Sequence, residues 1–266
     1  MASFQSSDVS SLGATPTVWC SPSGHDAVLQ RVAGQVRRWA ALPAEGRPQL
    51  RTNRSATSSF SLRHADKSGA QTVDVGGLRH VIELDEKAQT VRIEPQATVG
   101  EVTDALAKHG WMLEATLEME GASLGGLALS QGLTTHSHQC GFVHDTVTEW
   151  EFVTGQGEVL VANAEQNSDV FVTAGMSQGS LGVLTALTLR VVPTTKEVLI
   201  TYETVDDLDQ LANVMMKRMA DPDIDFAEAI AFSAEHSVVI TGVGLSDAVA
   251  ARRAAEGTPP QNHGAW

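Results

Sequence analysis

The stretch GASLGGLALSQGLTTHSHQCG, which runs from Gly121 to Gly141, decides how the whole chain is interpreted. Its glycines at 121, 125, 126 and 132 remove side chains from a run otherwise rich in Leu, Ala, Ser and Thr. Glycine permits close backbone approach, and bare N–H groups on such a loop can hold a phosphate. A tight turn between packed elements would use the same residues, so the flanking sequence has to distinguish the two interpretations.

A strand and a capped helix are expected upstream of this stretch. Residues 90–94 (TVRIE) alternate apolar and polar side chains, as a half-buried strand does, and Pro95 ends the strand. Thr98 and Glu101 form a capping box for a helix that stops near Gly110. Earlier in the chain, Ser23 or Asp26 caps a helix to about residue 41, and two short strands flank Gly76-Gly77 between residues 72 and 84.

Downstream, a strand over residues 147–153 places Trp150 and Phe152 on one face and Glu149 and Glu151 on the other, and residues 158–161 return as its hairpin partner. The sequence GSLG at 179–182 then leads into a long strand over 183–192 that Pro193 ends. Beyond it, a strand at 197–202, a helix at 206–219 and strands at 226–232 and 238–243 form a β-α-β-β unit.

Composition excludes several classes of protein. The 266 residues carry a net charge of −14, which argues against binding nucleic acid or an anionic membrane. The two cysteines, Cys20 and Cys140, lie far apart in sequence and predict neither a disulfide framework nor a cysteine zinc site. No apolar run approaches the roughly 20 residues of a membrane span. The Ser-rich start lacks the features of a signal peptide and predicts a disordered tail.

Taken together, these motifs resemble the PCMH-type FAD-binding domain, also called the vanillyl-alcohol-oxidase type. Within that superfamily the chain is most similar to the delta(24)-sterol reductase family, over about residues 25 to 248. The resemblance rests on these residues: Val91 to Pro95, Thr98 to Val102, Gly110-Trp111, Leu124 to Leu127, Gly132, Ser137-His138, Gly141, Asp145, Glu165 to Asp169, Gly179 to Gly182 and Val239 to Val243.

The resemblance implies an α+β fold, with a two-lobed FAD-binding domain followed by a partial α/β cap. The expected division is a disordered tail over 1–24, the FAD-binding domain over 25–193, the partial cap over 194–247 and a second disordered tail over 248–266. The usual Gly-rich His-Ser loop of the first lobe is absent, and Arg51 to Ser55 occupies its place. Arg51 and Arg54 either meet a diphosphate there or are simply solvated.

The cofactor implied is non-covalent FAD, with NADPH as its reductant and a sterol-like substrate bearing a side-chain double bond. The resemblance assigns no catalytic residue and no metal ligand. The residues expected to contact FAD are Arg54, Ser123, Leu124, Gly125, Gly126, Leu127, Gly132, Leu133, Thr134, Thr135, Ser137, His138, Gly141, Gly182 and Val183.

Alternatives remain open for both the site and the activity. At first sight His136, His138 and Cys140 suggest a metal site, but residues two apart in an extended segment face opposite ways, and no acidic ligand lies nearby in sequence. Glu118 and Glu120 are either an acid/base pair or, as we favour, exposed loop carboxylates. A flavin oxidase acting on an alcohol or a sugar acid, and a catalytically silent flavin-binding module, compete with the sterol reductase.

The β-α-β-β unit is smaller than the family's cap, which is expected to weaken both FAD binding and sterol turnover. Its helix at 206–219 keeps an apolar stripe with little sheet to cover it, so a partner chain or self-association is expected. The absence of an apolar span predicts a cytoplasmic protein, and the resemblance adds peripheral contact with the endoplasmic reticulum.

Overall fold

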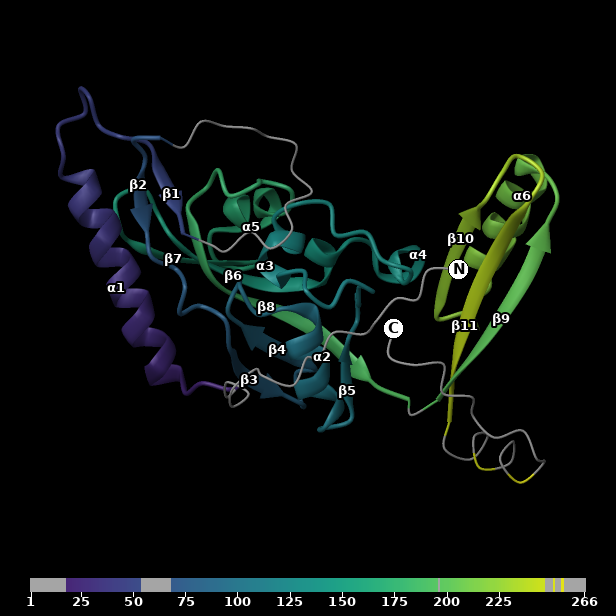
Figure 1. The fold of residues 1–266 in the computed structure, drawn as a ribbon. Helices are drawn as coiled ribbons and strands as arrows, with labels where there is room; N and C mark the ends of the chain where they lie inside the picture. The colour runs from purple at the N-terminus through teal and green to yellow at the C-terminus, as the bar shows by residue number, and fades with distance from the viewer. Residues whose placement is uncertain (1–17, 54–67, 196, 247–250, 252–254, 256–266) are drawn as a thin grey trace, which may run out of the picture.

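The computed structural model describes residues 18–53, 68–195, 197–246, 251 and 255 (Figure 1). Helices and strands are mixed along the chain, as the expected α+β class requires. In chain order the elements are α1 (Pro22–Ala40), β1 (Leu50–Thr52), β2 (Gln71–Val73), β3 (Val81–Asp85), β4 (Thr90–Ile93), α2 (Val99–Ala107), β5 (Trp111–Leu113), α3 (Leu124–Ala128), α4 (Ser137–Cys140), η1 (Val143–Thr146), β6 (Val147–Val153), β7 (Val159–Asn163), α5 (Ser168–Ala174), β8 (Val183–Pro193), β9 (Glu197–Val205), α6 (Leu208–Met219), β10 (Phe226–Ala231) and β11 (Ser237–Leu245).

The long strand β8 lies at the centre of the larger sheet, whose order is β3-β4-β8-β6-β7, with β5 paired to the far end of β8. All of these pairings are antiparallel. The strand predicted at 183–192 and the hairpin predicted at 147–161 are therefore both confirmed. The main core packs α2 and α3 against this sheet, and it buries Trp150, Phe152 and Leu187 almost completely.

A smaller cluster forms the first lobe. Helix α1 packs Leu29, Val32 and Val36 against the parallel pair β1–β2 and against Leu78. Figure 1 shows α1 along one side of the molecule, with β1 and β2 beside it. Ser21, rather than Ser23 or Asp26, caps the helix by accepting a hydrogen bond from Gly24, because Pro22 fits the first helical turn.

The chain between β4 and α3 wraps around Pro95. Thr98 and Glu101 form the predicted capping box at the start of α2, with both reciprocal hydrogen bonds present. The backbone N–H of Gln96 donates to Leu78 (2.9 Å), which ties this junction to the first lobe. The sequence therefore predicted this unit correctly, because its signals are local.

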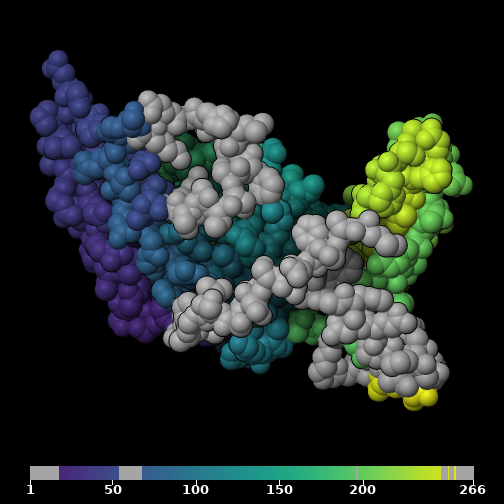
Figure 2. All heavy atoms as spheres, in the orientation of Figure 1, coloured from purple at the N-terminus to yellow at the C-terminus, as the bar shows by residue number. Residues whose placement is uncertain are grey.

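The predicted β-α-β-β unit is also confirmed. Strands β9, β10 and β11 form a separate antiparallel sheet in the order β10-β11-β9, and α6 contacts all three strands. Figure 2 shows this C-terminal unit projecting from the rest of the molecule. Within the described residues, no helix is both long and apolar enough to span a membrane.

Three expectations need comment. Residues 18–24, placed by sequence in the N-terminal tail, take part in the fold, because residues 18–20 pair with β3 and α1 begins at Pro22. Glu151, expected on the face of β6 opposite Trp150 and Phe152, is buried there, because α1 covers that side of β6. The other expected tail residues (1–17 and most of 248–266) and Arg54 lie outside the described residues.

Candidate functional site

The Gly-rich stretch folds as a short helix, a loop and a second short helix. Helix α3 follows Ser123, and its first two N–H groups are held by the Pro95 junction. The N–H of Leu124 donates to Ala97 (3.0 Å), and that of Gly125 donates to Pro95 (2.9 Å). The stretch is thus built directly onto the strand–Pro–helix unit.

The glycines have different surroundings. A Cβ on Gly125 would lie 2.4 Å from Pro95 Cβ and 2.7 Å from Pro95 Cα and O, so this glycine is required by packing. A Cβ on Gly132 would meet Val143 at 2.8 Å. On Gly126 the nearest atom is Ser123 Oγ at 2.8 Å, a side-chain atom that can rotate away, and on Gly121 nothing lies within 4 Å. Gly126 and Gly121 are therefore the glycines that the fold itself constrains least.

The loop that follows α3 is organised by its own hydroxyl groups. The N–H of Thr134 donates to Ser137 Oγ (2.8 Å), and the N–H of His136 donates to Thr134 Oγ1 (3.0 Å). Residues 137–140 are helical, not extended, so the argument from strand alternation against a metal site at His136 and His138 does not apply. His138 is instead engaged with backbone carbonyls.

The C-terminal unit docks on this loop. His138 Nε2 lies 3.1 Å from the Ile224 carbonyl oxygen, and Gln139 donates to the same oxygen at 2.6 Å. The N–H of Ala227 in β10 donates to Thr135 O at 3.0 Å. These contacts place one edge strand of the C-terminal sheet against residues 134–139.

A pocket of ≈ 250 Å³ lies at this junction. From the loop side, Leu133 contributes an apolar side chain that is 64% exposed. Glu228 faces it from β10, and its pKa is raised by burial and by the nearby negative charge of Glu118. The lining is therefore apolar, hydroxylic and acidic, and it comes from Glu118, Leu133, Thr134, Thr135, Ala227 and Glu228.

The predicted contact residues divide into two groups. Leu133, Thr134 and Thr135 line the pocket. The other described ones are not among its lining residues: Ser123, Leu124, Gly125, Gly126 and Leu127 lie in and before α3, Gly132 lies against Val143, Ser137 and His138 lie in α4, Gly141 lies at its end, and Gly182 and Val183 lie at the start of β8 opposite Val153. Their contact with a cofactor stays a prediction.

Sequence reasoning missed Glu228 and a buried charge network. His25 is 1% exposed, and its two ring nitrogens lie 2.8 Å from Glu94 Oε1 and 3.0 Å from Glu151 Oε1. Hydrogen bonds to these two carboxylates outweigh burial and raise the pKa of His25 to about 9, so the ring is a cation that donates to both. Arg92 NH2 lies 2.8 Å from Glu151 Oε2 and completes the charge balance.

Nothing local in the sequence signals this network, because His25, Glu94 and Glu151 come from three distant elements. The only hint is a histidine among the apolar positions of α1. The pKa values of Glu94 and Glu151 are both lowered; burial opposes ionisation, and hydrogen bonds from His25 overcome it. The network ties α1 to the larger sheet.

Comparison with known proteins shows what this chain is similar to. Residues 39–163 match the family model described as an FAD binding domain. The delta(24)-sterol reductase of Homo sapiens is 28% identical over 86% of this chain and 44% of its own length, and that of Arabidopsis thaliana is 27% identical over 91% and 44%. The crystal structure of 6-hydroxy-D-nicotine oxidase from Arthrobacter nicotinovorans matches the fold with a TM-score of 0.58 at 18% identity, covering 89% of this chain and 57% of that one. The chain spans less than half the length of the curated relatives it matches.

Proposed function

We propose that this chain reduces a carbon–carbon double bond in a sterol-like substrate, with FAD as cofactor and NADPH as reductant; the match of residues 39–163 to an FAD binding domain and the similarity to delta(24)-sterol reductases support this proposal. The observation that carries the proposal is the junction pocket, where the Gly-rich loop meets β10. FAD supplies hydride transfer when it is bound. In this proposal the protein supplies the binding surface and the proton.

The residues at the junction fit one part of FAD better than another. Ligand sites usually measure roughly 300–1,000 Å³, so a pocket of ≈ 250 Å³ holds only a part of the cofactor. Leu133 offers an exposed apolar surface that a flat aromatic ring would cover. Glu118 and Glu228 would repel a diphosphate. We therefore assign the pocket to the ring end of FAD and to the adjoining substrate atoms.

The diphosphate needs donors elsewhere. Within the described part of the chain, the backbone N–H groups of Gly126 and Gln131 donate no hydrogen bond. The small residues around Gly126 let another group approach this backbone. Contact of the diphosphate with residues 123–135, the stretch expected to wrap the diphosphate and the ring edge, is thus compatible with the donors that the fold leaves free.

Glu228 favours reduction over oxidation. Saturating a double bond requires a hydride on one carbon and a proton on the other, whereas oxidising an alcohol requires a base. A carboxyl group with a raised pKa is a proton donor at a higher pH than an ordinary glutamate. Thr135, fixed by its hydrogen bond to Ala227, holds the loop against the strand that carries Glu228.

The test begins with the purified chain reconstituted with FAD. Bound flavin is measured by absorption after gel filtration, and flavin bleaching by NADPH is followed without substrate. Reoxidation by a sterol with a side-chain double bond is then compared with oxygen consumption on alcohols. Sterol-dependent reoxidation supports the proposal, oxygen-dependent alcohol oxidation supports the oxidase, and bound flavin with neither activity supports the silent module.

A variant pair separates the role of Glu228 from mere folding. Glu228→Gln should retain flavin and its reduction by NADPH but slow sterol-dependent reoxidation by about 10²-fold or more, the usual range for a lost general acid. Glu235→Gln, in the exposed turn before β11, is the matched control. Equal reoxidation rates in both variants would remove Glu228 from the proposal.

A further inference from the structure

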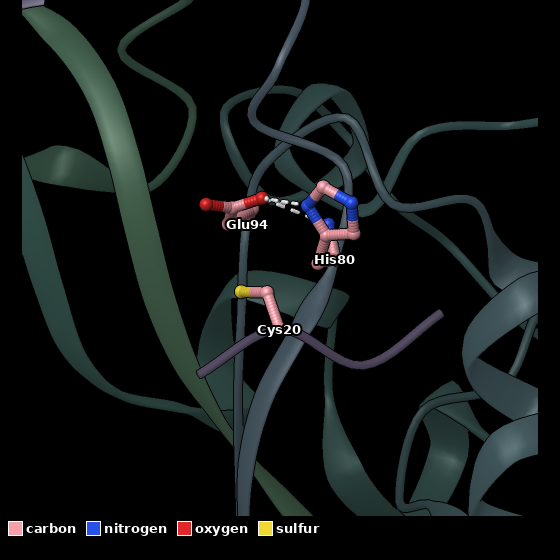
Figure 3. Close-up of side chains that lie close together, drawn as sticks. All are labelled: Cys20, His80 and Glu94. Atoms are coloured by element: carbon pink, nitrogen blue, oxygen red, sulfur yellow. Dashed lines mark hydrogen bonds and ion pairs between the residues drawn. The ribbon is translucent and has the colours of Figure 1, made fainter. Parts of the chain in front are cut away.

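Three side chains with metal-binding atoms converge beside the β3–β4 pair, outside the junction pocket. Cys20, His80 and Glu94 each place one such atom within 4.8 Å of the other two. Figure 3 shows the three side chains close together, with His80 and Glu94 joined by dashed lines and Cys20 beside them. They comprise one sulfur, one nitrogen and one oxygen donor.

Backbone hydrogen bonds fix these three positions independently of the side chains. The N–H of Cys20 donates to Val81 O at 2.9 Å, directly after His80 in sequence. The N–H of Glu94 donates to His80 O at 2.8 Å. The sheet therefore holds the three Cα atoms in place before an ion binds. Less conformational entropy of the chain is then lost on binding.

Hydrogen bonds from His25 and His80 orient the Glu94 carboxylate. Its Oε1 accepts a hydrogen bond from His25 (2.8 Å), and His25 is itself held by Glu151. Its Oε2 points to His80, accepting from the ring Nδ1 at 2.8 Å and from the backbone N–H at 2.9 Å. Support of a ligand by a second layer of hydrogen bonds is the arrangement that metal sites use.

The other two donors are available. The Cys20 thiol is half-buried, and it donates no hydrogen bond to any of the described residues. The His80 side chain is 30% exposed, so an ion has a path from solvent to the buried carboxylate. Cys140, the second thiol of the chain, differs because it contacts the carbonyl oxygen of His136.

We propose that Cys20, His80 and Glu94 bind a divalent transition metal ion of the zinc class. A mixed sulfur, nitrogen and oxygen set suits Zn²⁺, whereas Mg²⁺ and Ca²⁺ require oxygen donors throughout. The ion takes the place of the hydrogen bond between His80 Nδ1 and Glu94 Oε2. The ring proton moves to Nε2, and the thiol proton is released to solvent.

Three protein ligands leave the fourth tetrahedral position to water. The ion would join residues 18–20 to the ends of β3 and β4, and so fasten the segment before α1 to the larger sheet. None of the three ligands lines the junction pocket, so metal binding can be measured on the chain without added flavin.

Co²⁺ is the probe, because its absorption reports thiolate ligation and four-coordination. The full chain, without an affinity tag and after treatment with a chelator, is titrated with Co²⁺ under reducing conditions. We expect one equivalent to produce a sulfur-to-cobalt charge-transfer band together with intense visible bands. One equivalent of Zn²⁺ should abolish both.

The two cysteines provide a matched pair of variants. Cys20→Ser should lose the charge-transfer band, and Cys140→Ser should keep it. His80→Gln should weaken cobalt binding at least 10-fold while circular dichroism stays unchanged. The proposal is overturned if Co²⁺ does not bind the wild-type chain at about 100 μM, if the band survives in Cys20→Ser, or if it disappears in Cys140→Ser. The first result would leave the three residues as a hydrogen-bonded cluster only.

Discussion

Replacing Gly125 with alanine is the sharpest test of how the Gly-rich stretch is built. The new Cβ would lie 2.4 Å from Pro95 Cβ and 2.7 Å from two Pro95 backbone atoms. Contacts under 3.0 Å require movement, and here the obstructing atoms belong to a rigid ring and a backbone. Helix α3 must therefore shift away from the Pro95 junction.

The magnitude follows from what this shift disrupts. Overpacking a closed contact costs about 1–3 kcal/mol. Separating the two backbones also strains the hydrogen bonds from Gly125 to Pro95 and from Leu124 to Ala97, each contributing about 1 kcal/mol. Alanine regains up to about 1 kcal/mol from helix propensity. We expect a net loss of about 2–4 kcal/mol, which lowers Tm by roughly 5–15 °C in a chain of this size.

The assay is thermal and urea denaturation of Gly125→Ala beside Gly121→Ala. Gly121 has open space within 4 Å, and its φ is not in the left-handed region, so alanine there should change stability by less than about 0.5 kcal/mol. If both variants have the same Tm as the wild-type protein, α3 does not pack on Pro95 as described. Flavin content is measured separately. A Gly125→Ala variant with wild-type stability but no bound flavin would show that Gly125 is required for flavin contact and not for packing.

The remaining predictions concern three other positions. Gly126→Val should fold normally, because Ser123 Oγ can rotate away, yet retain no flavin on gel filtration; normal flavin content would contradict the cofactor assignment. His25→Leu leaves Glu94 and Glu151 buried without the cation between them, so urea denaturation in the presence of a chelator should show a loss of about 3–5 kcal/mol, with exposed His236→Leu as the neutral control. In Cys20→Ser, the sole thiol Cys140 has a pKa raised by burial to about 11, so its alkylation rate should rise tenfold per pH unit up to about pH 10; a plateau near pH 9 would show an ordinary thiol.

The fold was predictable wherever the signals are local. Three features depend on residues only a few positions apart: the capping box at Thr98, the turn directly before β8, and each helix and strand of the β-α-β-β unit. Such patterns specify element type and order. They also carried the family resemblance, because its motifs are short and occur in a fixed order.

The buried charge network was not predictable in this way. Alternation along β6 placed Glu151 on the face opposite Trp150 and Phe152, but it does not show that α1 lies over that face or that a bulge between Glu151 and Phe152 shifts the register. His25 and Glu151 are 126 residues apart. For the same reason Cys20 appeared in the sequence to lack metal-ligand partners, since His80 and Glu94 reach it only through strand pairing.

Glu94 and Pro95 connect the network to the Gly-rich stretch. Glu94 has its carboxylate in the network with His25 and His80, and the next residue, Pro95, forms the surface on which Gly125 packs. A displaced Glu94 must therefore move the carbonyl that accepts from Gly125, and α3 with it. Since α3 leads into the loop that lines the junction pocket, the buried ion pairs contribute to the position of Leu133 and Thr134 without touching either. Burying two carboxylates costs desolvation free energy. In return, the ion pairs make rigid the junction where the first lobe, the larger sheet and the candidate flavin site meet.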